Sequence, residues 1–165
     1  MNDRRRAMLR FILLFLGLFL LFEALIYTVL VKSGIYDAHL AWNARASGWI
    51  LAWFYEGVQV VGNHIRSPAY SITVAIGCDA IQPLSVYLAG VLSFPVPWRR
   101  KLAGALAGAV ILQAVNLVRI TSLFALGRHR PDLFEMAHVE VWQGLFIVLA
   151  LALWIAWVRW ADARS

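Results

Sequence analysis

The sequence has few charged residues and almost no cysteine. Charged residues make up 15% of its 165 positions, whereas hydrophobic residues make up 62%, and the mean hydropathy is +0.71. A soluble domain of this length cannot bury so much apolar surface. The shortage of charge therefore excludes an ordinary soluble protein and indicates a membrane protein.

The chain has one cysteine, Cys78, so it cannot form an internal disulfide. It contains no Cys-x-x-Cys motif and no Cys/His cluster with the spacing of metal ligands. We therefore expect neither a metal site nor a cofactor. Cys78 lies in the segment AIGCDAIQP (75–83), at the junction of an alternating apolar run and a long apolar one.

Four hydrophobic stretches have the length of a membrane span, which needs roughly 20 apolar residues. They cover residues 11–31, 78–94, 102 to about 126, and about 138–158. Arginines precede the first stretch, as in a signal peptide, but its length and the lack of an Ala-x-Ala site favour a retained signal anchor. Glu23 in this stretch is expected to face another helix. The sequence thus predicts an all-α integral membrane bundle of about four helices, forming a single membrane domain over residues 1–165.

The positive charges follow the predicted spans. Lys and Arg outnumber Asp and Glu by 15 to 9, for a net charge of +6. They gather before the first span, between the second and third, and after the fourth: Arg4, Arg5, Arg6, Arg10, Arg99, Arg100, Lys101, Arg159 and Arg164. With four spans these clusters share one side, as the positive-inside rule requires of cytoplasmic ends. No basic run is interleaved with exposed aromatics, so we expect no nucleic acid partner.

This topology places residues 32–77 on the extracytoplasmic side, where the pattern changes midway. Trp42, Ala46, Trp49, Ile50 and Trp53 recur at helical spacing. Asn43 and Ser47 lie elsewhere on the wheel, so we expect a Trp-rich helix in the membrane interface. From Val58, VQVV, Gly62-Asn63 and HIRSPAYSITVAIG favour a small β-hairpin leading to Cys78. An irregular loop is the alternative.

Three reactive side chains fall at one predicted membrane level. Cys78 begins the second span at its outer end, Arg119 lies within two turns of the outer end of the third, and His138 begins the fourth. A helix N-terminus and a nearby cation favour the nucleophilic thiolate. An imidazole can accept the thiol proton and later protonate a leaving amine. Arg119 can support the thiolate, hold an oxyanion, or dock a carbonyl or carboxylate. The sequence leaves these roles of the arginine open.

Each of these residues also has a structural interpretation. Cys78 can be a small apolar filler, Arg119 can reach the headgroups, and His138 can be an ordinary interfacial histidine. The other histidines are expected to lie in loops, facing solvent or headgroups: His39, His64 and His129.

Polar neighbours of the candidate residues are possible supporting residues. Gln113 and Asn116 share a helix face with Arg119, and such a polar stripe usually faces the bundle interior. Asp79 is expected either to cap the helix after Cys78 or to orient His138.

Three segments, in this order, resemble the exosortase/archaeosortase family of polytopic membrane cysteine transpeptidases. They are the Cys78 segment, NLVRITSLFALG (116–127) and FEMAHVEVWQGLF (134–146). The small size and the hairpin-like VQVVGNHI look most similar to short members of the exosortase H type. The resemblance covers roughly residues 40–158. It departs after the cysteine, where the family often has Ser or Asn and then Gly, whereas this chain has Asp79 and Ala80.

The resemblance implies that Cys78 is the nucleophile, Arg119 of Asn-x-x-Arg the essential arginine, and His138 the general base and acid. The implied partners are membrane-anchored proteins with a C-terminal sorting tail, which has a recognition motif, a transmembrane helix and a basic cluster. The enzyme would cleave near the motif through a Cys78 acyl thioester and transfer the chain to an acceptor. The implied site is on the extracytoplasmic face of the bacterial cytoplasmic (inner) membrane.

The residues also leave a contrasting function open. The chain can be a non-catalytic membrane subunit of a secretion or polysaccharide-export complex, whose outer polar cluster only packs helices together.

Overall fold

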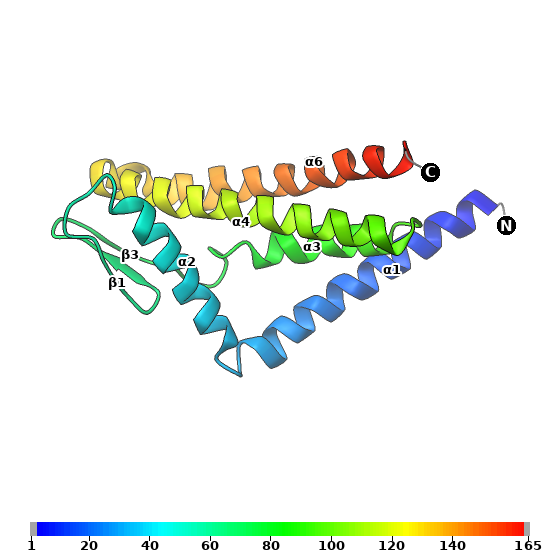
Figure 1. Cartoon of the computed structure of the whole chain (residues 1–165), viewed down its shortest axis with the longest axis horizontal. Helices are drawn as coiled ribbons and strands as arrows, with labels where there is room; N and C mark the ends of the chain where they lie inside the picture. Colours follow the sequence, from blue (N-terminus) through cyan, green and yellow to red (C-terminus); the bar gives the residue numbers. More distant parts are fainter. Residues whose placement is uncertain (1–2, 164–165) are drawn as a thin grey trace.

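The computed structural model describes residues 3–163, which are mainly helical (Figure 1). α1 (Asp3–Leu25) continues into a π-helical turn, η1 (Ile26–Leu30), and α2 (Ile35–Leu51) follows. After a small sheet come α3 (Ile81–Ser93) and α4 (Trp98–His129). The last segment consists of η2 (Pro131–Leu133), α5 (Phe134–Met136), η3 (Ala137–Val141) and α6 (Trp142–Asp162).

Three helical segments among the described residues are long and apolar enough to cross a membrane. They are Asp3–Leu30, Trp98–His129 and Pro131–Asp162. The predicted span 78–94 is not confirmed, because its helix, α3, has only 13 residues. At 1.5 Å per residue it is about 20 Å long, less than the hydrocarbon thickness of about 30 Å. Two prolines, Pro95 and Pro97, follow α3 and prevent its extension.

The ends that carry the basic clusters lie together. Figure 1 shows the start of α1, the start of α4 and the end of α6 at one end of the molecule, with the sheet at the other. This arrangement agrees with the prediction that the clusters share one side of the membrane. Which side faces the cytoplasm stays a prediction.

Small residues let the helices pack closely. Tyr87 of α3 lies against Gly108 of α4 and donates its hydroxyl hydrogen to the carbonyl of Gly104, at 2.9 Å. A side chain at either glycine would collide with an aromatic ring. On the other side of α3, the Ser85 hydroxyl donates to Glu23 of α1 at 2.9 Å, so Glu23 does face another helix as expected.

The predicted β-hairpin is confirmed and extended by a third strand. β1 (Gln59–Val61) and β2 (His64–Arg66) are antiparallel and joined at Gly62, whose φ is 60°. β3 (Ser71–Thr73) pairs with the other edge of β2, also antiparallel, which gives the order β1-β2-β3. Buried apolar residues from the sheet, including Ile65, join residues of α2 and α4 in one core.

α2 is the predicted Trp-rich helix, but its buried face carries polar residues. Trp42, Trp49 and Trp53 are exposed, whereas Asn43 and Ser47 are fully buried. The tryptophans are therefore available to a surrounding interface, although the interfacial position of α2 stays a prediction. Of the buried polar side chains of α2, Asn43 faces α4 and Tyr36 faces the Cys78 segment.

Candidate active site

Cys78 lies in a tight turn that leads from the sheet into α3. Gly77 has a φ of 91° and Ala80 a φ of 60°, both in the left-handed region. The Cys78 N–H donates to the carbonyl of Ala75 at 2.9 Å. Helical geometry begins only at Ile81, so the prediction that Cys78 begins the helix is wrong by three residues. The left-handed residues delay the helix and leave the half-buried thiol on the turn.

His138 contacts this thiol. The Cys78 sulfur and the His138 Nε2 are 2.9 Å apart, although 60 residues separate them in the chain. His138 lies in the π-helical turn η3, a feature that recurs at functional sites. Its ring stacks on Phe134, with 5.7 Å between centroids and an interplanar angle of 27°. This stacking orients the imidazole toward the sulfur.

Arg119 of α4 is buried beside the same turn. Its side chain is 6% exposed, its Nη1 donates to the carbonyl of Gly77 at 3.2 Å, and its guanidinium lies 5.5 Å from the ring centroid of Phe146. Arg119 therefore does not reach the headgroups. Its Nε has no hydrogen-bond partner within residues 3–163, and no carboxylate of these residues forms an ion pair with it. The buried positive charge is thus available to an anionic group at the site.

The electrostatics favour a neutral thiol in the resting state. Burial raises the pKa of Cys78 above its ordinary value, and the negative charge of Asp79 raises it further. The positive charge of Arg119 lowers this pKa, as expected, but does not overcome burial. A base is therefore needed to remove the proton, and His138 lies at hydrogen-bonding distance.

The predicted polar stripe on α4 faces the interior, as expected. Asn116 is fully buried, and its amide donates to the carbonyl of Cys78 at 3.1 Å and to Oδ1 of Asn43 at 3.0 Å. Gln113 donates to the same Oδ1 at 2.7 Å. The stripe thus connects the cysteine turn, α4 and α2.

Asp79 caps α3 and does not orient His138. Its Oδ1 accepts the N–H of Ile81 at 3.1 Å, which satisfies one free donor at the helix start. Its Oδ2 accepts the hydroxyl hydrogen of the buried Tyr36 on α2. Burial and this hydrogen bond raise the pKa of Tyr36. Asp79 therefore anchors the turn to two helices.

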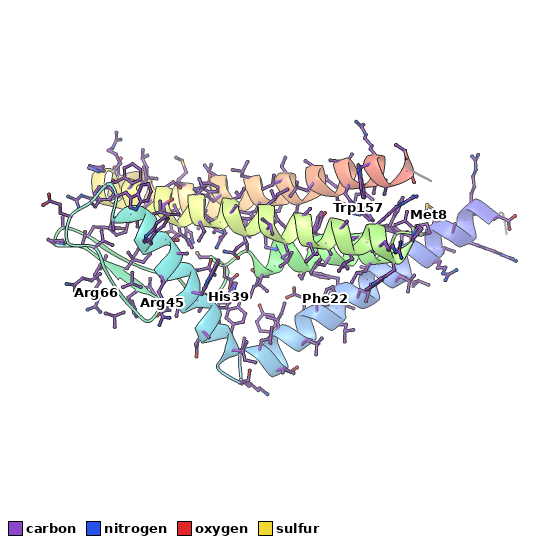
Figure 2. All side chains as sticks on the ribbon, viewed as in Figure 1. Met8, Phe22, His39, Arg45, Arg66 and Trp157 are labelled. Carbon is purple, nitrogen blue, oxygen red and sulfur yellow. The ribbon has the colours of Figure 1, made fainter. Side chains whose placement is uncertain are left out.

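The prediction that His39 faces solvent or headgroups is wrong. His39, labelled in Figure 2, is half-buried on α2, and its Nε2 lies 3.2 Å from the Asp79 carbonyl oxygen and 3.0 Å from Nδ2 of Asn43. Sequence reasoning missed Tyr36, His39 and Asn43 as neighbours of the site. Their spacing of three and four residues puts them on one helix face, and that pattern was the available signal.

The two residues that depart from the family pattern have local explanations. Ala80 adopts a left-handed conformation, which glycine adopts without strain and alanine does not. Asp79 makes a hydrogen bond to the helix start that Ser and Asn can also make. The departures therefore keep the shape of the turn, and Asp79 adds a negative charge.

A cavity of about 310 Å³ opens beside the thiol and the imidazole. One wall is the continuous segment 70–75, which includes β3, and the other contains Ile120, Leu123 and Phe134. Its walls are mainly apolar. Within the described residues, no three His, Cys, Asp or Glu side chains gather closely enough to hold a metal ion.

Comparison with known proteins identifies a family. The family model for the transmembrane exosortases (Exosortase_EpsH) matches residues 3–157, which is nearly the whole chain. No curated protein and no solved structure matches it. The match agrees with the resemblance of the Cys78, Arg119 and His138 segments. It also agrees with the three long apolar helices. The chain therefore belongs to the transmembrane exosortase family.

Proposed function

We propose that this protein is a membrane-embedded cysteine transpeptidase or peptidase that cleaves C-terminal sorting tails of secreted proteins. The main support is the 2.9 Å contact between the Cys78 sulfur and the His138 Nε2, formed across 60 residues of chain and beside an open cavity. A buried thiol that only fills space does not require an imidazole at hydrogen-bonding distance. An imidazole at this distance can act as the general base that activates a cysteine nucleophile.

The reaction begins with proton transfer from Cys78 to Nε2 of His138. The thiolate attacks the scissile carbonyl carbon, and the carbonyl π electrons move to its oxygen. When the tetrahedral intermediate collapses, the C–N bond breaks and His138 gives its proton to the leaving amine. The products of this acylation step are the released tail and an acyl thioester on Cys78. An acceptor amine or water then loses a proton to His138, attacks the thioester and restores the thiol.

Arg119 suits the charge that develops during these steps. Its guanidinium is buried, has no carboxylate partner within residues 3–163 and has an unpaired Nε. A fixed cation in a site of low dielectric constant stabilises a thiolate or an oxyanion more than it does in water. Its bond to the Gly77 carbonyl holds this charge next to the Cys78 turn.

The membrane supplies part of the binding. A substrate anchored by its own transmembrane helix diffuses in the same bilayer, so the reacting groups meet at a high effective concentration. A deep soluble pocket is then unnecessary, which is consistent with the moderate cavity beside Cys78. We infer that the site faces the extracytoplasmic side, opposite the basic clusters.

Replacing the nucleophile tests this function. In cells that produce a tailed protein from the same genome, Cys78→Ala should abolish conversion of the precursor, and His138→Ala should slow it by at least about a hundredfold. His129→Ala, at an exposed histidine, is the control and should leave conversion unchanged. The measurements are precursor processing on immunoblots and the amount of each variant in the membrane. Normal processing with Cys78→Ala would contradict the proposal and favour a non-catalytic subunit.

A further inference from the structure

The sheet beside Cys78 has an edge, on β3, whose backbone groups have no hydrogen-bond partner within residues 3–163. Residues of an antiparallel strand point their N–H and C=O groups alternately toward one neighbour and the other. The Val74 N–H donates to the Asn63 carbonyl, and the Ser67 N–H to the Tyr70 carbonyl, so Tyr70 and Val74 bond toward β2. By alternation Ile72 does so too, and Ser71 and Thr73 point away from β2.

This outward-facing edge borders the cavity of the candidate active site. All residues from 70 to 75 line the cavity, including those on both faces of β3. A cavity on one face of the strand would contact only alternate residues. The opposite wall contains Phe134 and His138, and Cys78 also lines the cavity. Figure 1 shows β3 on the side of the sheet toward α4 and α6.

We propose that the substrate segment next to the scissile bond binds as an extended strand along the free edge of β3. This inference rests on the proposed function and adds the mode of recognition. The N–H and C=O groups of Ser71 and Thr73 would pair with alternate residues of the substrate, and the scissile carbonyl would lie at Cys78. Main-chain pairing of this kind gives affinity that does not depend on the substrate side chains.

The direction of β3 and the walls of the cavity support binding of an extended substrate segment. β3 runs directly into the turn that carries Cys78, so a peptide paired with the strand reaches the thiol without bending away. Side chains of an extended peptide alternate between its two faces. One set would contact the apolar wall of Ile120, Leu123 and Phe134. We therefore expect apolar residues at alternate positions of the recognised segment.

A peptide probe with only alanine side chains tests whether main-chain pairing with β3 promotes the reaction at Cys78. The probe is acetyl-tetra-alanine whose C-terminal carboxyl group is replaced by a vinyl sulfone, to which the Cys78 thiol adds. The sulfur bonds the vinyl carbon farther from the sulfone, and the vinyl carbon beside the sulfone gains the thiol proton. Iodoacetamide, which has no peptide to pair, is the reference reagent. Because Cys78 is the only cysteine, the intact mass of the purified protein reports its labelling directly.

Ser71→Pro should weaken labelling by the peptide probe alone. Proline is tolerated at the first residue of an edge strand, and here it removes only an outward N–H. The rate with the peptide probe, divided by that with iodoacetamide, should fall about tenfold. Val60→Pro is the control, because the Val60 N–H points outward at the opposite edge of the sheet, and its ratio should be unchanged. An unchanged ratio in Ser71→Pro would overturn the proposal.

The unmodified protein provides a second test that does not depend on folding of a variant. Two versions of the probe carry N-methyl groups on alternate amides, in the two complementary patterns. If the peptide pairs with β3, one pattern should slow labelling about tenfold and the other should not. Equal rates for the two patterns, whether fast or slow, would overturn the proposal.

These outcomes separate the binding mode from the catalytic function. If Cys78→Ala abolishes processing but the two methylated probes react equally, the enzyme stands and only the strand pairing is wrong. If the precursor is still processed normally in cells that carry Cys78→Ala, the catalytic function is wrong, whatever the probes show.

Discussion

At the scale of single residues, the site combines a buried cation and a buried anion around one thiol. Arg119 and Asp79 act on the pKa of Cys78 in opposite directions, and burial raises it. The net direction of the Cys78 pKa thus favours the neutral thiol over a preformed thiolate. In the proposed reaction, attack on a substrate then requires proton transfer to His138, which couples nucleophile formation to the presence of the imidazole.

This balance predicts opposite effects of two neutralising substitutions. Arg119→Gln removes the charge that lowers the Cys78 pKa, so less thiolate forms and alkylation by iodoacetamide at pH 8 should slow severalfold. Asp79→Asn removes a charge that raises this pKa, so alkylation should become faster. In each protein the rate should rise with pH, because the thiolate fraction grows. The measurement is the alkylation rate between pH 6 and pH 10, followed by intact mass.

Denatured protein is the control, because all three chains should then react alike. A shift of both variants in the same direction would mean that altered packing, not charge, governs the thiol.

At the scale of elements, α2 holds the site through its polar face. Tyr36 and His39 contact Asp79, and Asn43 accepts hydrogen bonds from Gln113 and Asn116 of α4. Asn116 in turn donates to the Cys78 carbonyl. The turn that carries Cys78 is therefore fixed by hydrogen bonds from helices on both sides.

Asn43→Leu should destabilise the fold. Leucine keeps a similar size, but it leaves the Gln113 amide without its acceptor and removes one of the two acceptors of the Asn116 amide. Buried donors without partners cost about 1–3 kcal/mol, so we expect a loss of about 2 kcal/mol. Trp49→Leu, on the exposed face of the same helix, should change stability by less than about 0.5 kcal/mol. Both values follow from unfolding in detergent monitored by tryptophan fluorescence. Equal stability of the two variants would show that the hydrogen bonds to Asn43 contribute nothing.

The sequence predicted the position of the site better than the details of its elements. Counting spans and charges placed Cys78, Arg119 and His138 at one level, because apolar length and basic clusters largely determine topology. It misplaced the start of α3, since the left-handed Ala80 is not visible in an apolar run. It also gave no prediction for the inner face of α2. Burial on α2 does not follow hydrophobicity. The tryptophans are apolar but exposed, whereas the polar Asn43 is buried and has hydrogen-bond partners that only the folded chain provides.

At the scale of the whole molecule, the sheet and the basic clusters lie at opposite ends. Figure 1 shows the sheet at one end and the loop between α3 and α4 toward the other, with α3 between them. α3 joins the two levels although its helix is only about 20 Å long. If α3 crosses the bilayer, the flanking turns must complete the path or the bilayer must be thinner there.

Labelling of single cysteines decides whether α3 crosses. In a Cys78→Ala background, Ala69→Cys lies in the loop between β2 and β3 and Trp98→Cys at the start of α4, and both positions are exposed. The cluster Arg99 to Lys101 favours a cytoplasmic position for the second site. A membrane-impermeant maleimide on intact spheroplasts should therefore label Ala69→Cys, and should label Trp98→Cys only after lysis. Labelling of both before lysis would make α3 a re-entrant helix, and the reverse pattern would invert the orientation and place Cys78 on the cytoplasmic side.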